Sequence, residues 1–337
     1  MTHAYFVILA GGSGERLWPL SSPARPKQLI PFINGITLLE QTIVRIQSLI
    51  RSKNHLFILT NTDQQEAIKK IVGKQGSVIV EPIGRNTAPA IASACAELYE
   101  KNPDAVIAIL PSDHFIPESE NIHALLTAAI AYASFYDKLV LLGIKPTFAA
   151  TGYGYIQYTS TQQISGWTCY PIEHFHEKPD KEKAQEYLEK DGIAWNIGIF
   201  VGKVKTFIQE FETHAPNLWQ NIQDYRSDKK KYDEIEPISI DHAIMEKSNN
   251  LVIFPAQFAW HDVGNLTTFL SLKMQYEKTG SAEIVNVNGQ DNIAYAAKKT
   301  VAFVGVSNIC LVESENEIIV VAQDQVESVR KVLTSLR

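Results

Sequence analysis

The first 145 residues alternate short runs of β-branched and other apolar residues with amphipathic segments. The apolar runs that predict strands span residues 4–10, 56–60, 77–80, 105–110 and 139–143. This alternation is typical of βαβ units, in which helices connect parallel strands and cover both faces of one sheet. We therefore predict an α/β fold with a Rossmann-like mixed, mostly parallel sheet flanked by helices.

Helix starts are marked by capping patterns. The segments Thr37-Leu38-Leu39-Glu40 and Thr62-Asp63-Gln64-Gln65 each place a threonine three residues before a glutamate or glutamine. In a capping box, each of the two side chains accepts a hydrogen bond from the other residue's backbone N–H, so both segments predict helix starts. Further helices are expected from Thr87 to about residue 100 and over 121–135.

Beyond residue 150 the pattern changes to longer strands, expected at 153–159, 169–176 and 194–201, separated by polar helices. A helix after Gly264 is followed by short apolar runs at 284–287, 301–306, 309–312 and 317–321, and by a closing helix at 325–336. We expect a main domain over 1–280 and a small β-rich C-terminal module over 281–337. The tail could equally form a small antiparallel cap on the main domain.

Charge and composition exclude several classes of protein. The chain has 31 Lys and Arg against 37 Asp and Glu, a net charge of −6, which argues against a nucleic-acid partner. The three cysteines are far apart in sequence, so no disulfide framework is expected. Because no run of about 18 apolar residues occurs, we expect no membrane span and a cytoplasmic protein.

A glycine-rich loop follows the first predicted strand. It reads Ala10-Gly11-Gly12-Ser13-Gly14 after Leu9, and two cations, Arg16 and Lys27, come shortly afterwards. Glycines let backbone N–H groups approach a phosphate closely, while an arginine fork and a lysine charge suit a polyphosphate. The loop matches neither the P-loop nor the dinucleotide fingerprint, and it could also be an ordinary surface turn.

The glycine loop and the residues after it resemble the signature of the sugar-1-phosphate nucleotidyltransferases. The matching stretch runs from Gly11 to Leu20, Gly-Gly-Ser-Gly-Glu-Arg-Leu-Trp-Pro-Leu, and is followed by Pro26-Lys27. A longer string from Glu81 to Ala90, Glu-Pro-Ile-Gly-Arg-Asn-Thr-Ala-Pro-Ala, is similar to the segment that marks mannose-1-phosphate guanylyltransferases. The resemblance extends to at least Gly264. It implies that Leu9, Gly11, Gly12 and Gly14 bind the nucleotide, with the guanine edge near Glu81, Asn86 and Thr87.

Two aspartates follow candidate strands: Asp113 in Pro111-Ser112-Asp113-His114 and Asp262 in Trp260-His261-Asp262. Ligands of open α/β sheets collect beyond the carboxyl ends of strands, and two carboxylates suit Mg²⁺, although each aspartate alone could be a helix cap. The resemblance implies that both coordinate the divalent ion between nucleotide and sugar phosphate. The histidines beside them lack the spacing of a zinc site.

The sugar side is expected from Phe175-His176-Glu177-Lys178-Pro179 and Trp195-Asn196-Ile197-Gly198, with Gly154 nearby. A carboxylate beside a lysine can hold hydroxyls with one group and a phosphate with the other, although a plain surface ion pair is also possible. The resemblance implies that Glu177 and Asn196 bind sugar hydroxyls, that Lys178 meets the phosphate and that Gly154 admits the sugar. Ile197 and Asn265 depart from the family pattern, which has a small residue and Ser or Thr there.

The reaction implied by the resemblance is Mg²⁺-dependent transfer of GMP from GTP to mannose 1-phosphate, giving GDP-mannose and pyrophosphate by in-line attack without a covalent intermediate. Arg16, Lys27, Asp113 and Asp262 would be its catalytic residues. The alternatives are a sister enzyme using another nucleotide and hexose 1-phosphate, or a non-catalytic GDP-mannose-binding subunit. The tail resembles the partial left-handed β-helix of compact family members, which implies a homodimer, and isomerase activity is not expected.

Overall fold

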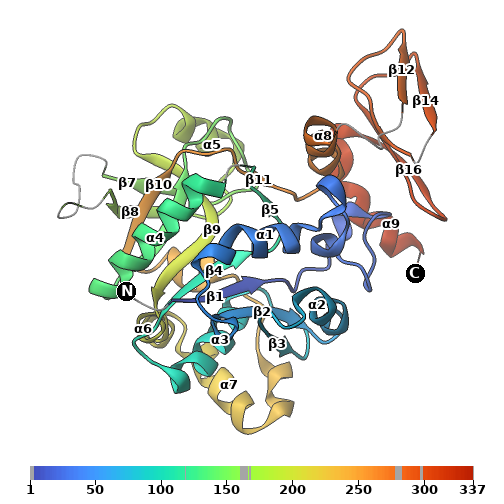
Figure 1. Ribbon diagram of the computed structural model, residues 1–337. Helices are drawn as coiled ribbons and strands as arrows, with labels where there is room; N and C mark the ends of the chain where they lie inside the picture. Colours follow the sequence, from blue (N-terminus) through green and yellow to red (C-terminus); the bar gives the residue numbers. More distant parts are fainter. Residues whose placement is uncertain are drawn as a thin grey trace.

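The structure is a computed structural model that describes residues 4–117, 119–159, 166, 168–277, 283–296 and 299–336. Its centre is a nine-stranded sheet in the order β3-β2-β1-β4-β9-β6-β10-β8-β7 (Figure 1). The strands of this sheet are β1 (Ala4–Leu9), β2 (Leu56–Asn61), β3 (Ser77–Glu81), β4 (Val106–Pro111), β6 (Leu139–Ile144), β7 (Tyr155–Tyr158), β8 (Tyr170–His176), β9 (Ile193–Lys203) and β10 (Leu251–Ala256). The predicted α/β class is confirmed, while the expected domain boundary at residue 280 lies outside the described residues.

The sheet is mixed. Strands β1 to β4 pair in parallel, so their carboxyl ends lie at one edge, where the glycine loop and Asp113 follow β1 and β4. Strand β9 runs antiparallel to its neighbours β4 and β6, whereas β6 and β10 are parallel. The strand β10 is absent from the predicted set, although its first four residues are all apolar. The parallel carboxyl edge is where a ligand site is expected.

Helices cover both faces of the sheet. Phe6 and Ile8 of β1 pack with α1, α2 and α4, whereas Val7 packs with α3, α6 and α7 on the opposite face, as the alternation of side chains along a strand requires. The α-helices are α1 (Leu38–Ile46), α2 (Gln65–Val72), α3 (Thr87–Lys101), α4 (Ser119–Phe135), α5 (Lys181–Leu188), α6 (Val204–His214), α7 (Pro216–Ser227), α8 (Leu266–Tyr276) and α9 (Val329–Leu336). Among the described residues, no helix combines the length and hydropathy that a bilayer span demands.

The two predicted capping boxes have different outcomes. The Thr37 hydroxyl accepts from the Glu40 amide at 3.2 Å, and the Glu40 carboxylate accepts from the Thr37 amide at 2.8 Å, so the first box is confirmed. The second prediction is wrong, because α2 begins at Gln65 with Gln64 as its N-cap and no side-chain capping bond. The Thr62 hydroxyl instead donates to the carbonyl of Glu81 at 3.3 Å. It therefore joins β2 to β3 rather than starting a helix.

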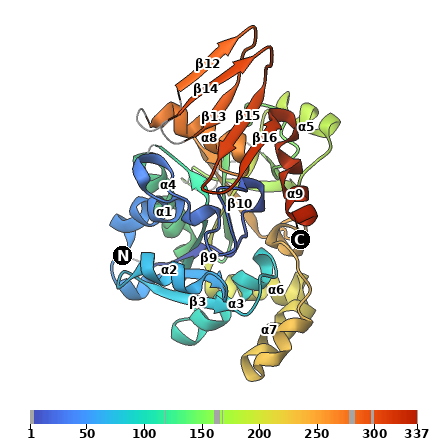
Figure 2. The same ribbon diagram turned by 90° about the vertical axis from the view of Figure 1, so that its right-hand side faces the viewer.

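A small β-rich module stands at one end of the molecule, beside α8 (Figure 2). In it β12 (Glu283–Val287) pairs in parallel with β14 (Thr300–Val304), β13 (Ile293–Tyr295) pairs in parallel with β15 (Ile309–Glu313), and β15 pairs antiparallel with β16 (Ile318–Ala322). A 3-10 helix, η8 (Gln323–Ser328), leads into α9. Buried side chains of the module pack with Leu17 and with residues of α8 in one cluster, so the module shares a core with the main domain.

Candidate active site

The glycine loop connects β1 to a short 3-10 helix, η1 (Glu15–Leu17). Gly14 has φ +68°, and a Cβ there would lie 2.7 Å from the Lys27 backbone nitrogen, so a larger residue does not fit. A Cβ on Gly11 or Gly12 would meet nothing within 4 Å. Side chains hold three of the loop carbonyls: those of Ala10, Gly11 and Gly12 accept from Gln28, Thr60, Asn61 and Gln64. The open side of the loop can therefore admit a phosphate.

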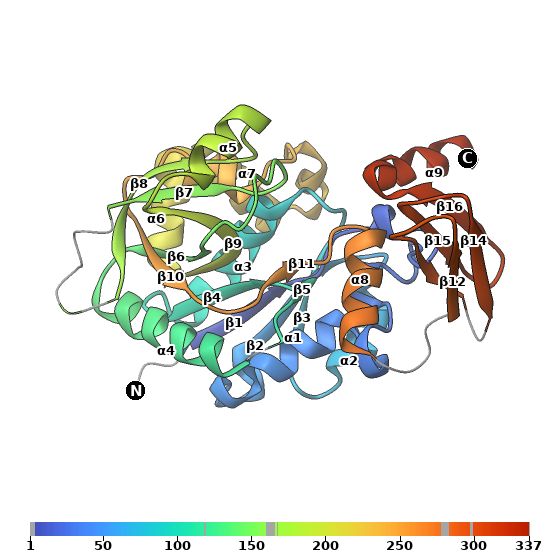
Figure 3. The same ribbon diagram turned by 90° about the horizontal axis from the view of Figure 1, so that it is seen from above.

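The two predicted aspartates come together. Asp113 follows β4, and β5 (His114–Phe115) pairs antiparallel with β11 (His261–Asp262), so that Asp262 lies opposite His114. Figure 3 shows these two short strands side by side between the main sheet and α8. One potential ligand atom from each of Asp113, His114 and Asp262 lies within 4.8 Å of the others. Two hard carboxylate ligands at this spacing fit Mg²⁺.

Lys27 is the cation of this cluster. Its ammonium forms an ion pair with the Asp113 carboxylate and lies 3.4 Å from the carbonyl of Val263. Burial opposes the charge on Lys27, but Asp113 and then Asp262 outweigh it and raise the pKa of the ammonium. Burial likewise opposes ionisation of Asp113, and Lys27 outweighs it, so the pKa of this carboxyl is lowered. The pair is therefore charged at neutral pH.

The ring of His114 lies beside the two carboxylates and is hydrogen-bonded to Trp260. Burial lowers its pKa, so the ring is neutral at neutral pH. The indole N–H of Trp260 donates to Nδ1 of His114 at 3.1 Å, which assigns the ring proton to Nε2, 4.0 Å from Asp113. A protonated Nε2 can donate a hydrogen bond but cannot bind a metal ion. In this arrangement the two carboxylates are the side chains that could hold a divalent cation.

Arg16 reaches the same region from η1. A Cβ on Gly264 would lie 3.8 Å from Nη1 of Arg16 and 3.7 Å from a carboxylate oxygen of Asp262, so both side chains border Gly264. The guanidinium is half exposed and forms an ion pair with Glu327 of the C-terminal module at 3.1 Å. Arg16, Lys27 and the two aspartates therefore lie around one end of the sheet.

The predicted sugar-side residues also meet. A Cβ on Gly154 would lie 2.7 Å from a carboxylate oxygen of Glu177 and 3.4 Å from Cβ of Asn196, so only glycine fits between them. The Asn196 amide donates to the carbonyl of Gly154 at 2.8 Å. Lys178 lies 2.6 Å from Glu177 with its side chain 60% exposed, at a φ of +48°. Because the Lys178 side chain is exposed, it can pair with an anion that arrives from solvent.

A second carboxylate, not predicted from the sequence, lies at the sugar side. Asp241 begins a π-helical turn, η7 (Asp241–Met245), and accepts a hydrogen bond from the Asn196 side chain at 2.9 Å. Burial and then the charge of Glu177 raise the pKa of Asp241 to about 7. The Glu246 carboxylate, just after this turn, accepts from the Glu177 amide at 3.0 Å. The sequence of this segment indicates only an ordinary helix. The feature that points to a functional site is the π-helical turn, which is visible only in the structure and is frequent at such sites.

The residues expected at the guanine edge have different surroundings: Asn86 and Thr87 lie at the start of α3, whereas the Glu81 side chain is buried. A Cβ on Gly84 would lie 3.9 Å from the Gly11 carbonyl, so this segment runs beside the glycine loop. Asn86 caps α3 by accepting from the Thr87 amide at 2.8 Å, and the Thr87 hydroxyl accepts from the Ile240 amide at 2.8 Å. The carboxyl of Glu81 is buried and accepts from the Tyr232 hydroxyl. The Glu81 side chain is therefore bound to Tyr232, in the segment that follows α7.

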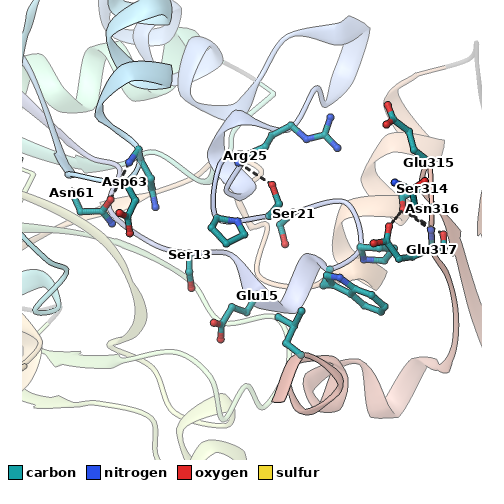
Figure 4. A pocket seen from close by; sticks show the side chains of 16 residues that line it. Ser13, Glu15, Ser21, Arg25, Asn61, Asp63, Ser314, Glu315, Asn316 and Glu317 are labelled. Atoms are coloured by element: carbon teal, nitrogen blue, oxygen red, sulfur yellow. Dashed lines mark hydrogen bonds between the residues drawn. The ribbon is translucent and has the colours of Figure 1, made fainter. Parts of the chain in front are cut away.

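A cavity of about 560 Å³ opens between the glycine loop and the C-terminal module. Figure 4 shows Ser13 of the loop and Glu15 of η1 facing it, with Asn61 and Asp63 on one side and the turn 314–317 on the other. Lys27, Asp113 and Asp262 do not line it. The cavity therefore adjoins the cluster of cation and carboxylates rather than containing it.

Comparisons with known proteins cover nearly the whole chain. Residues 5–279 match the family described as nucleotidyl transferase, and residues 282–336 match the "MannoseP isomerase/GMP-like beta-helix domain". The chain is 32% identical to a mannose-1-phosphate guanylyltransferase of Salmonella muenchen and 32% identical to the xanthan biosynthesis protein XanB of Xanthomonas campestris. Each of these matches covers 98% of this chain and 73% of the relative.

A solved structure has the same fold throughout. The structure described as mannose-1-phosphate geranyltransferase from Thermus thermophilus superposes with a TM-score of 0.87 at 31% identity, covering 99% of each chain. The sequence matches and this superposition both span nearly the whole chain, including the C-terminal module. The chain therefore belongs to the nucleotidyl transferase family, in the group whose curated relatives are mannose-1-phosphate guanylyltransferases.

Proposed function

We propose that this protein transfers GMP from GTP to α-D-mannose 1-phosphate, forming GDP-mannose and pyrophosphate. The observation that carries the proposal is the meeting of Asp113, Asp262 and Lys27 at the carboxyl edge of the parallel strands, beside the glycine loop. The names of the curated relatives support the choice of guanine nucleotide and mannose. The string from Glu81 to Ala90 favours this reaction over a sister enzyme for another nucleotide.

The attacking group needs no general base, because a sugar phosphate is already an anion at neutral pH. The task of the protein is to bring two anions together in line and to stabilise the charge that develops on the α-phosphate and the leaving pyrophosphate. Lys27 and Arg16 would supply positive charge, and the open amides of the glycine loop would hold phosphate oxygens. Mg²⁺ bound by Asp113 and Asp262 would neutralise further phosphate charge.

The sugar would lie against Gly154, where no side chain intervenes. Glu177 and Asp241 offer acceptors for hydroxyls, and Asn196, fixed between Asp241 and the Gly198 amide, keeps this wall rigid. Lys178 would meet the sugar phosphate. A pocket built from paired polar groups rejects a sugar that leaves one of them unpaired, which is how selectivity for the hexose would arise.

We also propose that the protein is a homodimer associated through its C-terminal module. Val304, Ile318 and Val320 on the module strands are 62–66% exposed, and Val285 and Val287 add to this apolar set. Of these residues, Val287 and Val304 are cross-strand partners in the β12–β14 pair, and exposed apolar residues that lie together mark interaction surfaces. Light scattering coupled to size-exclusion chromatography tests this; a monomer at all accessible concentrations would exclude it.

Pyrophosphate release in the presence of GTP, mannose 1-phosphate and Mg²⁺ tests the proposed reaction. We expect release only when both substrates are present, and much slower release when UTP, dTTP or CTP, or glucose 1-phosphate, replaces one of them. A preference for another nucleotide would favour a sister enzyme. Binding of GDP-mannose with no release from any pair of substrates would favour the non-catalytic subunit.

A further inference from the structure

One carboxylate of the C-terminal module lies at the active site. Glu327, in η8, binds Nη1 of Arg16 at 3.1 Å through one oxygen and accepts from the Asn265 side chain at 3.2 Å through the other. Arg16 belongs to the turn after the glycine loop, and Asn265 is three residues after Asp262. The carboxylate thus bridges the two segments that carry the phosphate cation and a metal aspartate.

The backbone on both sides of this bridge is fixed by packing. Val326 and Val329 flank Glu327 at 5% and 1% exposure, and Leu17, next to Arg16, is fully buried. Leu17 and Val329 belong to one hydrophobic cluster with Leu266 of α8. Figure 1 shows α9, in red, beside the blue N-terminal segment that contains η1. The module therefore holds the Glu327 carboxylate at a defined place relative to Arg16.

The contact leaves most of the guanidinium available. Glu327 engages Nη1, whereas an arginine has five N–H donors, so Nη2 and Nε can still bind a phosphate. Both side chains are about half exposed, and such pairs contribute little to stability. What the bridge can do is order a flexible side chain before the triphosphate arrives, which removes an entropic cost from binding.

Asn265 gives this bridge its second anchor. Its side-chain oxygen accepts from the Thr268 amide at 3.0 Å and caps α8, while its nitrogen donates to Glu327. The Ser or Thr usual in the family at this position has no amide nitrogen to donate in this way. The asparagine at position 265, which differs from the family pattern, is therefore matched by a carboxylate of the C-terminal module, Glu327.

We propose that Glu327 is a positioning residue for Arg16, through which the C-terminal module takes part in binding the nucleoside triphosphate. This inference rests on the proposed function, since it assigns Arg16 to the phosphates of GTP. The opposite possibility, that Glu327 competes with phosphate for Arg16, predicts the opposite sign of effect.

The test is a double-mutant cycle of Glu327→Gln and Arg16→Ala, with Glu283→Gln as the matched control. Glu283 is an exposed carboxylate of the same module that accepts from Thr300 on β14, remote from η1. We expect Glu327→Gln to lower kcat/KM for GTP about 5- to 10-fold and to weaken GTP binding in calorimetry by the same factor. Glu283→Gln should change neither quantity, and both variants should unfold at the wild-type temperature.

The cycle separates positioning from a structural role. In the Arg16→Ala background, Glu327→Gln should cost no further activity, because there is no guanidinium left to orient. Additive losses, an unchanged kcat/KM in the single variant, or tighter GTP binding by Glu327→Gln would each overturn the proposal. Wild-type turnover by Arg16→Ala would overturn it as well. If the wild type released no pyrophosphate, the proposed function would fail, and GTP affinity would still decide the role of Glu327.

Discussion

At the scale of single residues, Lys27 combines burial with a positive charge. Its ammonium is the cation that faces Asp113 and, through space, Asp262, and these carboxylates hold it in the charged form despite burial. A buried, charged lysine next to a glycine loop is an efficient phosphate ligand, because its charge is little screened by water.

We predict that Lys27→Ala lowers kcat by about 10²–10³-fold while the fold is retained, because one preorganised donor to the reacting phosphates is lost. Steady-state pyrophosphate release and circular dichroism measure the two effects. Lys69→Ala, which removes an exposed lysine paired with Glu66 on α2, is the control and should behave as wild type. Near-normal turnover by Lys27→Ala would refute the assignment.

Asp241 can be tested through the sugar substrate alone. Asp241→Asn would lose an acceptor for a sugar hydroxyl and would disturb the Asn196 side chain, so we expect KM for mannose 1-phosphate to rise roughly tenfold with KM for GTP unchanged. Asp224→Asn on α7, where Asp224 accepts from Gln220, is the matched control. An equal rise of both KM values would point to a general structural defect instead.

At the scale of elements, the end of β3 carries a buried acid. Glu81 is 4% exposed and accepts from Tyr232, and burial raises its pKa to about 7 even though that hydrogen bond acts in the other direction. The ordinary value is 4.5, so between these two values the folded protein binds a proton that the unfolded chain has released. Stability from this group is present below pH 4.5 and is lost as the pH rises through about 7.

We therefore predict that Glu81→Gln is less sensitive to pH than the wild type. From pH 5 to pH 8 the wild-type free energy of unfolding should fall by roughly 2–3 kcal/mol more than that of the variant. Urea unfolding at intervals of one pH unit measures the difference, with Glu66→Gln on α2 as the control, since Glu66 is an exposed carboxylate paired with Lys69. Parallel pH profiles for wild type and Glu81→Gln would contradict the raised pKa.

The elements also show what a sequence can and cannot predict. The Thr37 box succeeded because its partners are local, three residues apart on one helix. The Thr62 box failed because a tertiary partner, the Glu81 carbonyl, competes for the hydroxyl across two strands. The strand β10 was missed for a different reason: a short apolar run has no periodicity that distinguishes a strand from a buried helix.

At the scale of the whole molecule, the motif residues could be named from the sequence, but their distances could not. Asp113 and Asp262 are 149 positions apart and meet only because β5 and β11 pair. Asp241 and Glu327 escaped notice because neither stands in a recognisable motif. Their side-chain contacts form only in the folded state: Asp241 with Asn196, and Glu327 with Arg16 and Asn265.

The measurement that tests the shared metal site most directly is an Mg²⁺ titration of initial rates at saturating GTP and mannose 1-phosphate. If, as we propose, each aspartate would supply one ligand to the same ion, Asp113→Asn and Asp262→Asn should each raise the half-saturating Mg²⁺ concentration by about tenfold or more. Asp104→Asn, at an exposed pair with Lys205, should titrate as wild type. A wild-type Mg²⁺ requirement in either active-site variant would contradict a single ion held between β5 and β11.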